Sequence, residues 1–377
     1  MAEHLHKLDI NIHVLAPADA YHGISIENEV TVHRFKYFPG RWQKLTYGSG
    51  VLSNLKRNPL LWLQIPFYIL AMAYHLLRTT RRLKPDIVHA HWILPQGLIA
   101  LIIAKYICRV PVVITVHGGD AFAFRSKLFQ GIKRFCVEKS TAWTSNTQAT
   151  ADAIGIPVAS RPYIIPMGVD TQRFASGNRG RLRTTDKRLQ HVILFVGRLV
   201  EKKGVDDLIT ALALLPEDLR RQTQLWIIGD GDQRHQLTQT AEQLGIIDNT
   251  RFLGLVPNQE LPDYYSAADL FVAPSVVAAS GDTEGQGVVF LEAFAAKTCV
   301  LATKVGGISE IIEDGITGLL VESRRPSELA RKIELLLENP ALRHALAGNA
   351  HRRVAQSYSW EKVARRFQEL YKSILAR

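Results

Sequence analysis

The chain has 377 residues, of which 47% are hydrophobic and 21% charged. This length predicts two or three domains or one large α/β protein, at about 100–200 residues per domain. The composition excludes disordered, collagen-like, coiled-coil and small disulfide-stapled proteins. The cysteines Cys108, Cys136 and Cys299 match no metal-ligand spacing and predict buried thiols in a reducing compartment. The first eight residues lack the apolar core of a signal peptide, so we expect a cytoplasmic protein.

The net charge of +11 is concentrated in the first half of the chain. Residues 1–175 hold 20 Lys and Arg against 10 Asp and Glu, whereas the remaining residues hold 26 against 25. This asymmetry predicts that one domain faces an anionic surface or substrate. Nucleic acid is not the expected partner, because the basic half has no recognition motif and its charges alternate with apolar runs.

The chain opens with an amphipathic segment over residues 2–8, and the first predicted strand is Ile10–Leu15. A doubly wound domain normally opens with a strand that becomes central in its sheet. Without that strand, buried strand edges would be left with unpaired N–H and C=O groups. We therefore expect either that the first strand and its loop are missing from this domain or that another strand fills the gap.

An uncharged segment follows from Asn58 to Leu77, and its length is sufficient to span a bilayer. Pro59, Pro66 and His75 interrupt it, and basic residues flank both ends, which gives no positive-inside orientation. A transmembrane anchor is therefore not expected. Two interpretations stay open, a buried core helix and an interfacial helix that faces a membrane.

Short apolar runs alternate with helical segments along the rest of the chain, as expected for parallel strands covered on both faces. The predicted strands are Asp86–His89, Val112–Val116, Ala142–Ser145, Tyr163–Ile165, His191–Val196, Gln224–Ile228, Thr250–Phe252, Leu270–Ala273, Val300–Ala302 and Gly318–Val321. Helices are predicted at Val205–Leu215, Gln233–Leu244, Pro326–Glu338 and Trp360–Leu375. Repeated βα units predict two Rossmann-like, doubly wound parallel sheets, with ligands in a cleft at the carboxyl ends of the strands.

A polar, Gly-containing linker at residues 175–180 separates the two series of strands. The expected domains are therefore residues 1–175, which are basic, and residues 176–358. The last helix, within residues 359–377, is expected to pack back across both of them.

The strongest chemical signal is a pair of carboxylates, Glu284 and Glu292, separated by the segment Gly285-Gln286-Gly287-Val288. The glycines allow backbone to approach a ligand, and Val288 begins a predicted helix. A helix N-terminus offers free N–H groups and a positive dipole end to a diphosphate. The two carboxylates can accept hydrogen bonds from sugar hydroxyls. A helix capped by an acidic loop, with a solvated second Glu, is the alternative.

A second signal follows the predicted strand His191–Val196, where Gly197-Arg198 precedes Lys202-Lys203-Gly204. Cations at the carboxyl end of a strand suit an anionic leaving group. An ordinary basic turn is the alternative.

These two signals, in this order, resemble the retaining family-four glycosyltransferases of the GT-B fold over nearly the whole chain, including bacterial surface-polysaccharide enzymes of the teichuronic and colanic acid type. The matching motifs are Val196-Gly197-Arg198-Leu199 with Lys203-Gly204, Ile228-Gly229-Asp230-Gly231, Phe252-Leu253-Gly254, Tyr264-Tyr265-Ser266-Ala267-Ala268-Asp269, Glu284 with Glu292, Val305-Gly306-Gly307-Ile308-Ser309-Glu310, Asp314-Gly315-Ile316-Thr317-Gly318-Leu319-Leu320-Val321, Val116-His117-Gly118-Gly119-Asp120 and Ile165-Pro166-Met167-Gly168-Val169-Asp170. The joint match is specific, whereas each motif alone is not.

The resemblance implies a retaining transfer of sugar from a nucleotide-diphospho-sugar to a glycan or polyprenyl-linked acceptor in surface polysaccharide synthesis. It assigns catalytic roles to His117, Arg198, Lys203 and Glu284. It assigns donor binding to Gly197, Val256, Gly285, Gln286, Gly287, Val288 and Glu292. Arg198 and Lys203 would neutralise the leaving diphosphate, Glu292 would bind the ribose, and Val256 would lie near the base. Glu284 would contact the donor sugar, and His117 would face both that sugar and the acceptor. No cofactor or metal is expected.

Two candidate metal sites are set aside. Asp230-Gly231-Asp232 is placed in a strand-to-helix turn, and His89 with His91 lacks further ligands for zinc. The basic first domain and the segment from Asn58 to Leu77 suit peripheral docking on the cytoplasmic membrane face. The family's Gly-Gly loop after the first strand is absent from this sequence. A degenerate donor-binding or scaffold protein is therefore the alternative to an active transferase.

Overall fold

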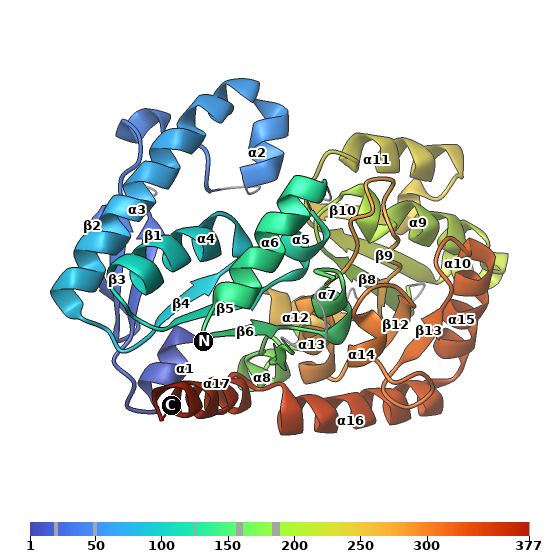
Figure 1. The fold of residues 1–377 in the computed structure, drawn as a ribbon. Coiled ribbons are helices and arrows are strands. Elements are labelled where there is room, and N and C mark those ends of the chain that lie inside the picture. Colours follow the sequence, from blue (N-terminus) through green and yellow to red (C-terminus); the bar gives the residue numbers. More distant parts are fainter. Residues whose placement is uncertain (19–21, 48–50, 124–125, 156–160, 183–188, 377) are drawn as a thin grey trace. The chain divides into compact units, whose positions relative to one another are not determined.

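The computed structural model describes residues 1–18, 22–47, 51–123, 126–155, 161–182 and 189–376. They form two compact units, shown as ribbons in Figure 1. Unit 1 comprises Met1–Asn146, Ala151–Ile165 and Val363–Arg377, and unit 2 comprises Thr147–Thr150 and Pro166–Lys362. Each unit combines helices with parallel strands around its own hydrophobic core, which confirms the predicted α/β architecture.

The helices that Figure 1 labels along the chain have the following bounds. They are α1 Ala2–His6, α2 Val51–Arg57, α3 Gln64–Leu83, α4 Leu98–Ala100, α5 Gly118–Phe122, α6 Lys127–Lys139, α7 Gln148–Asp152, α8 Thr171–Ala175, α9 Val205–Ala213, α10 Glu217–Arg221, α11 Arg234–Gln243, α12 Leu261–Ala267, α13 Val288–Ala295, α14 Ile308–Ile311, α15 Pro326–Glu338, α16 Pro340–Ser357 and α17 Trp360–Leu375.

Unit 2 is built on one six-stranded sheet in which every pair of neighbouring strands is parallel. Its strands are β8 His191–Val196, β9 Thr223–Ile228, β10 Thr250–Gly254, β11 Leu270–Ala273, β12 Cys299–Thr303 and β13 Leu319–Val321. Their order is β10-β9-β8-β11-β12-β13, the arrangement of a doubly wound dinucleotide-binding fold. The chain winds outward from β8 in one direction and then from β11 in the other. The topological switch point therefore lies between β8 and β11.

Unit 1 contains two separate sheets. The first has the order β1-β3-β2, with β1 His13–Pro17, β2 Gly23–Glu27 and β3 Val30–Phe35. The second is parallel and has the order β4-β5-β6-β7, with β4 Val88–His91, β5 Val112–Val116, β6 Ala142–Ser145 and β7 Tyr163–Ile164. Among the described residues, β1 pairs with β3 and β4 pairs with β5, and no ladder joins the two sheets.

Among the described strands, β2 and β3 form the one antiparallel pair, a hairpin, and the sequence did not predict either strand. Its two-residue turn, Asn28-Glu29, has positive φ values of 49° and 67° at both positions. Both central residues of a type I′ turn require such values. Asn-Glu is not one of the common dipeptides of that turn, so the hairpin could not be predicted from its turn residues.

The segment from Asn58 to Leu77 forms a 3-10 turn, Pro59–Leu63, followed by the long helix α3. By length and composition Pro59–Leu83 could cross a membrane. In the folded protein, 22% of its most apolar 18-residue stretch is buried. One side of α3 packs into the core of unit 1 through Tyr68 and Met72. The opposite side exposes Phe67, Leu70 and Tyr74, so the interpretation as a buried core helix is wrong for that side.

Candidate active site

The candidate donor site lies in unit 2 at the switch point of its sheet. In open α/β sheets, ligands bind outside the carboxyl ends of the strands at such a point. β8 ends at Val196 and β11 ends at Ala273. The segments that leave these two ends contain most of the residues that the sequence singled out.

The turn after β8 places Arg198 and Lys203. The N–H of Gly197 donates to the carbonyl of Ile228 at 2.9 Å, which ties the start of the turn to β9. Gly204 ends the turn with a φ of +60°, and a Cβ there would lie 2.1 Å from the carbonyl oxygen of Pro274. Glycine is therefore required where this turn passes the segment after β11.

The two lysines of the turn bind the segment after β11. Lys203 Nζ donates to Glu284 Oε2 at 2.5 Å, and both side chains are 13% exposed. Lys202 Nζ donates to Asp282 and to the carbonyl of Thr283, each at 3.2 Å. Arg198 is exposed, and its guanidinium makes no hydrogen bond or ion pair with another described residue. Of the three cations, Arg198 has the guanidinium that is open to a ligand.

The segment after Glu284 presents a run of free backbone N–H groups. Within the described part of the chain, the N–H groups of Gly285, Gln286, Gly287, Val288 and Val289 donate to no other residue. Gly287 caps α13 with a φ of +75°, and the first bonded N–H of the helix is that of Phe290, which donates to the Gly287 carbonyl. Five consecutive free donors at a helix N-terminus form an anion-binding surface.

Close contacts hold this loop in place. A Cβ at Gly306, where φ is +52°, would lie 2.0 Å from the carbonyl oxygen of Glu284. The N–H of Gly307 donates to that same oxygen at 3.1 Å, and the Thr147 hydroxyl donates to the Gly285 carbonyl at 2.9 Å. The buried side chain of Gln286 accepts from the N–H and donates to the carbonyl of Met167. The side-chain amide of Gln286 is thus fully hydrogen-bonded within the protein, whereas its backbone N–H stays free.

Glu284 is an ionised carboxylate in a buried position. Burial acts to raise its pKa, but Lys203, Lys202 and Arg198 together outweigh burial and hold the pKa below the usual value. Lys203 acts through a direct ion pair with Glu284, and the charges of Lys202 and Arg198 lower the Glu284 pKa further. The site therefore combines concentrated positive charge with an acceptor that stays charged at neutral pH.

Glu292 lies one turn into α13 and has a different environment. Burial raises its pKa, and the Tyr265 hydroxyl, which donates to Oε2 at 2.8 Å, and the charge of Arg173 offset only part of that effect. Tyr265 is fully buried in α12. One carboxylate oxygen of Glu292 is thereby fixed, and the other makes no hydrogen bond within the described residues.

Val256 follows β10 and packs, partly buried, against the same hydrophobic core as Tyr265. The structure thus brings Gly197, Arg198, Lys203, Glu284 and the 285–288 loop together at one end of the sheet. Glu292 lies farther along the chain, on the helix α13 that follows this loop. The sequence did not predict the hydrogen bond from Tyr265 to Glu292 or the ion pair between Lys202 and Asp282. The Tyr264-Tyr265 motif was visible in the sequence, but its contact with Glu292 joins residues 27 positions apart.

His117 lies in unit 1, at the end of β5 and the start of α5. Its N–H donates to Asp120 Oδ1 at 2.8 Å, and the other oxygen of Asp120 accepts from the N–H of Ile93 at 2.8 Å. Asp120 therefore joins the two loops that follow β4 and β5. Burial raises the pKa of Asp120 to about 7, although these hydrogen bonds oppose the shift.

His117 belongs to a row of neutral histidines. Its Nε2 lies 3.1 Å from His91 Nδ1, and the rings of His91 and His89 stack with centroids 4.5 Å apart. Burial lowers the pKa of His117 to about 4, and burial with the charge of His117 lowers that of His91 to about 3. The two ring nitrogens of His89 contact Tyr371 Oη and Thr115 Oγ1, each at 2.6 Å. Within the described residues, no group of three or more His, Cys, Asp and Glu is arranged to hold a metal ion.

Known proteins are similar to this chain in fold and in sequence. Residues 184–353 match the family Glycosyl transferases group 1, and residues 1–173 match Glycosyltransferase Family 4. The chain is 31% identical over 340 residues to a D-inositol 3-phosphate glycosyltransferase of Actinosynnema mirum, covering 84% of this chain and 78% of that protein.

It is 27% identical over 383 residues to a Bacillus subtilis protein named as the teichuronic acid biosynthesis glycosyltransferase TuaC, covering 99% of this chain and 92% of that one. The structure of Anabaena HepE in complex with UDP has a TM-score of 0.74 at 20% identity, covering 97% of this chain and 100% of that one. The fold and the family matches together define a glycosyltransferase of the GT-B architecture. The chain belongs to the family Glycosyl transferases group 1.

Proposed function

We propose that this glycosyltransferase takes a nucleotide-diphospho-sugar donor and transfers its sugar with retention of anomeric configuration. The observation that supports this most is the row of five free N–H groups at residues 285–289, next to a cluster of cations. A diphosphate carries the charge and the acceptor oxygens that such a surface binds. The structure of HepE contains UDP, which makes UDP the first nucleotide to test.

Each residue of the candidate donor site in unit 2 then has a chemical role. The free N–H groups and the Arg198 guanidinium bind the diphosphate, and Lys203 adds charge while it holds Glu284. Glu284, kept ionised, accepts hydrogen bonds from hydroxyls of the donor sugar. Glu292 accepts from the ribose through the oxygen that Tyr265 leaves free, and Val256 lies beside the base.

In the transfer step, the bond from the anomeric carbon to the diphosphate oxygen breaks, and a bond to the acceptor oxygen forms on the same face. The acceptor hydroxyl gives its proton to the departing phosphate oxygen. The free N–H groups, Arg198 and Lys203 stabilise the charge that develops on the diphosphate. Positive charge therefore comes from the protein, and we propose that no metal is required.

We propose that the acceptor is a glycan or a lipid-linked glycan of a surface polysaccharide. The similarity to TuaC over nearly the whole chain supports this. His117 is assigned to contact the transferring sugar, as the family resemblance implies. Because its pKa is lowered to about 4, its ring is neutral at pH 7 and can both donate and accept.

Thermal unfolding of the purified protein with UDP, GDP, ADP and their sugar conjugates tests the donor site. A ligand at about 100 times its dissociation constant should stabilise the native state by roughly 2.7 kcal/mol. We expect one nucleotide class to give this shift, with or without a metal chelator. The shift should shrink in Glu292→Ala and Arg198→Ala but stay in the control Arg331→Ala, which removes an exposed cation of α15.

Product analysis with the stabilising donor then tests transfer. Binding without turnover, in the presence of extracted lipid-linked and soluble glycans, would favour the degenerate donor-binding alternative. A shift that is equal in all variants would contradict the proposed site.

A further inference from the structure

Unit 1 carries a long segment of one charge sign. Residues 30–85 contain ten Lys and Arg and no Asp or Glu. This segment accounts for the whole excess of positive charge of residues 1–175. It includes β3, the 3-10 turn Pro59–Leu63 and all of α3.

The turn and the helix have two apolar faces. The inner face consists of Leu61, Tyr68 and Met72, which are each 7% exposed and pack in the core of unit 1. The outer face consists of large side chains that recur every three or four residues, which is the spacing of one helix face. These are Leu63, Phe67, Leu70 and Tyr74, whose exposed fractions are 68%, 53%, 67% and 57%.

Further exposed apolar side chains accompany this outer stripe. Leu60 and Trp62 precede it with exposed fractions of 73% and 58%. Trp42 is 55% exposed, and its carbonyl accepts a 2.7 Å hydrogen bond from the side chain of Gln64 at the start of α3. We call Leu60, Trp62, Leu63, Phe67, Leu70 and Tyr74 the apolar stripe. Scattered single apolar residues are normal on a protein surface, whereas a contiguous set marks an interaction site.

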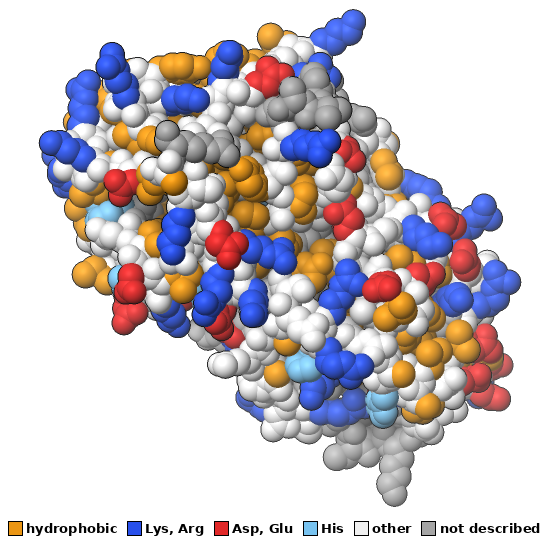
Figure 2. Space-filling view, turned by 60° about the horizontal axis from the view of Figure 1, so that its bottom comes forward, with side chains coloured by type: hydrophobic (Ala, Val, Ile, Leu, Met, Phe, Trp, Pro, Cys, Tyr) orange, Lys and Arg blue, Asp and Glu red, His pale blue; other side chains and the backbone are white. Residues whose placement is uncertain are grey.

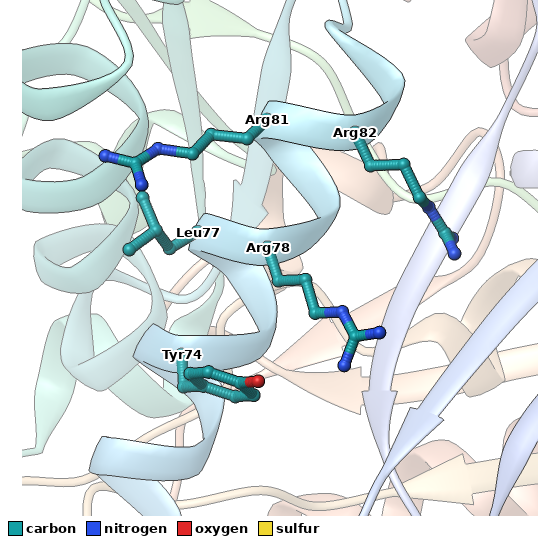
Figure 3. Close-up of a pocket in the computed structure, with 5 residues that line it drawn as sticks. All are labelled: Tyr74, Leu77, Arg78, Arg81 and Arg82. Atoms are coloured by element: carbon teal, nitrogen blue, oxygen red, sulfur yellow. The ribbon is translucent and has the colours of Figure 1, made fainter.

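Cations adjoin the stripe. Exposed Arg57 precedes it, and Tyr74, Leu77, Arg78, Arg81 and Arg82 line a hollow at its other end. Figure 3 shows the side chains of Arg78 and Arg82 on the same side of α3, with Arg81 and Leu77 on the other. In the view of Figure 2, charged side chains of both signs lie among hydrophobic ones, whereas α3 has cations and no carboxylates beside its apolar stripe. This is the combination that an anionic lipid surface binds, with aromatic and aliphatic side chains for the acyl boundary and cations for the headgroups.

Spanning the bilayer does not fit the packing of α3. Tyr68 packs edge-on against Tyr37, with ring centroids 5.2 Å apart, and Phe35 packs against His75 at 5.5 Å. A helix that crossed the bilayer would have to leave these partners and expose the core of unit 1. A helix that lies in the plane of the interface keeps its inner face in the protein and gives its outer face to lipid.

We propose that the apolar stripe, with Arg57, Arg78, Arg81 and Arg82, docks this protein on the surface of an anionic phospholipid bilayer. The α3 helix then lies in the interfacial plane. This inference does not depend on the nature of the donor or the acceptor, because it rests on exposed residues of unit 1 alone.

Cosedimentation of the full chain with vesicles, without any nucleotide, tests this proposal. The wild type should bind vesicles that contain phosphatidylglycerol and bind phosphatidylcholine vesicles much more weakly. Arg78→Gln/Arg81→Gln/Arg82→Gln removes three cations, each worth roughly a fivefold change in binding near an anionic surface. We therefore expect about a hundredfold weaker binding to the anionic vesicles.

The matched control is Arg251→Gln/Arg331→Gln/Lys362→Gln, which removes three exposed cations from unit 2. It should bind nearly as the wild type does. A second variant, Leu63→Gln/Leu70→Gln, keeps the charge but should lose binding, and unchanged thermal unfolding will show that it folds. The blue shift of Trp fluorescence on binding should fall in Trp62→Phe.

Several results would overturn the proposal. One is absence of binding to anionic vesicles, and another is equal loss of binding in the control. Full binding by Leu63→Gln/Leu70→Gln would show simple charge attraction without docking of the stripe. Wild type that only detergent releases would indicate a spanning helix. Dimerisation without lipid that Leu63→Gln/Leu70→Gln abolishes would assign the stripe to a second copy of the chain.

Discussion

At the scale of single residues, the pair of Lys203 and Glu284 joins the two segments that form the candidate donor site. Both side chains are largely buried, so each charge depends on the other for its stabilisation. Lys203→Met leaves Glu284 buried without its closest partner. Breaking such a pair costs about 3–5 kcal/mol, and we expect a loss of that order in denaturant unfolding at pH 7.

The pH dependence of this loss has a defined sign. The folded pKa of Glu284 is lowered, so its contribution to stability is present above the unfolded pKa, which is about 4.3. That contribution is lost as the pH falls through the folded pKa. The difference between wild type and Lys203→Met should therefore narrow in acid. Lys203→Met/Glu284→Gln should recover much of the stability, and failure to do so would contradict the ion-pair explanation.

Glu292 is predicted to behave in the opposite way. Its folded pKa is raised by burial, so its charged form destabilises the protein above that pKa. Glu292→Gln should raise stability at pH 7, and this advantage should fade as the pH falls toward the unfolded value of about 4.3. The same substitution should weaken nucleotide binding by roughly tenfold or more, because a charged hydrogen-bond acceptor is lost. Parallel unfolding and titration experiments check both results, and unchanged binding would remove Glu292 from the site.

At the scale of elements, the sequence predicted those parts of the site that local pattern determines. The bounds of β5, β6, β8, β11, α15 and α17 coincide with the predicted ranges. The start of α13 at Val288 was also predicted. Long-range contacts were not predictable. The ion pair between Lys202 and Asp282 and the hydrogen bond from Tyr265 to Glu292 depend on how the strands are ordered in the sheet. The sequence also could not show which face of α3 is buried and which is exposed, because both faces are apolar.

Alanine substitutions at two glycines can distinguish the effect of backbone strain from the effect of displacing the donor-site loop. Gly306 and Gly315 both have positive φ, at 52° and 74°, so alanine is strained at either position. A Cβ at Gly315 has open space, whereas one at Gly306 would meet the Glu284 carbonyl at 2.0 Å. Both alanine variants should lose about 1 kcal/mol or more. Only Gly306→Ala should also displace the 284–287 loop and lose nucleotide binding, and equal binding losses would contradict this explanation.

At the scale of the whole molecule, each of the four hydrophobic clusters lies within one unit. Two belong to unit 1 and two to unit 2. The helix α17 contributes to both units, since Trp360 packs against Gly168 in unit 2. Farther along, Gln368 donates to the Leu8 carbonyl and Tyr371 contacts His89, all within unit 1.

Separate cores predict separate responses to perturbation. Phe367 of α17 is 3% exposed and packs against His89, with ring centroids 5.3 Å apart in unit 1. Phe367→Ala should cost about 3–5 kcal/mol through the cavity it leaves, and this cost should fall on unit 1. The nucleotide should stabilise unit 2, where its proposed site lies. Calorimetry should then resolve two transitions, of which the variant lowers one and the ligand raises the other. If the variant and the ligand instead shift a single transition in opposite directions, the two units unfold together and the expectation of separate responses is wrong.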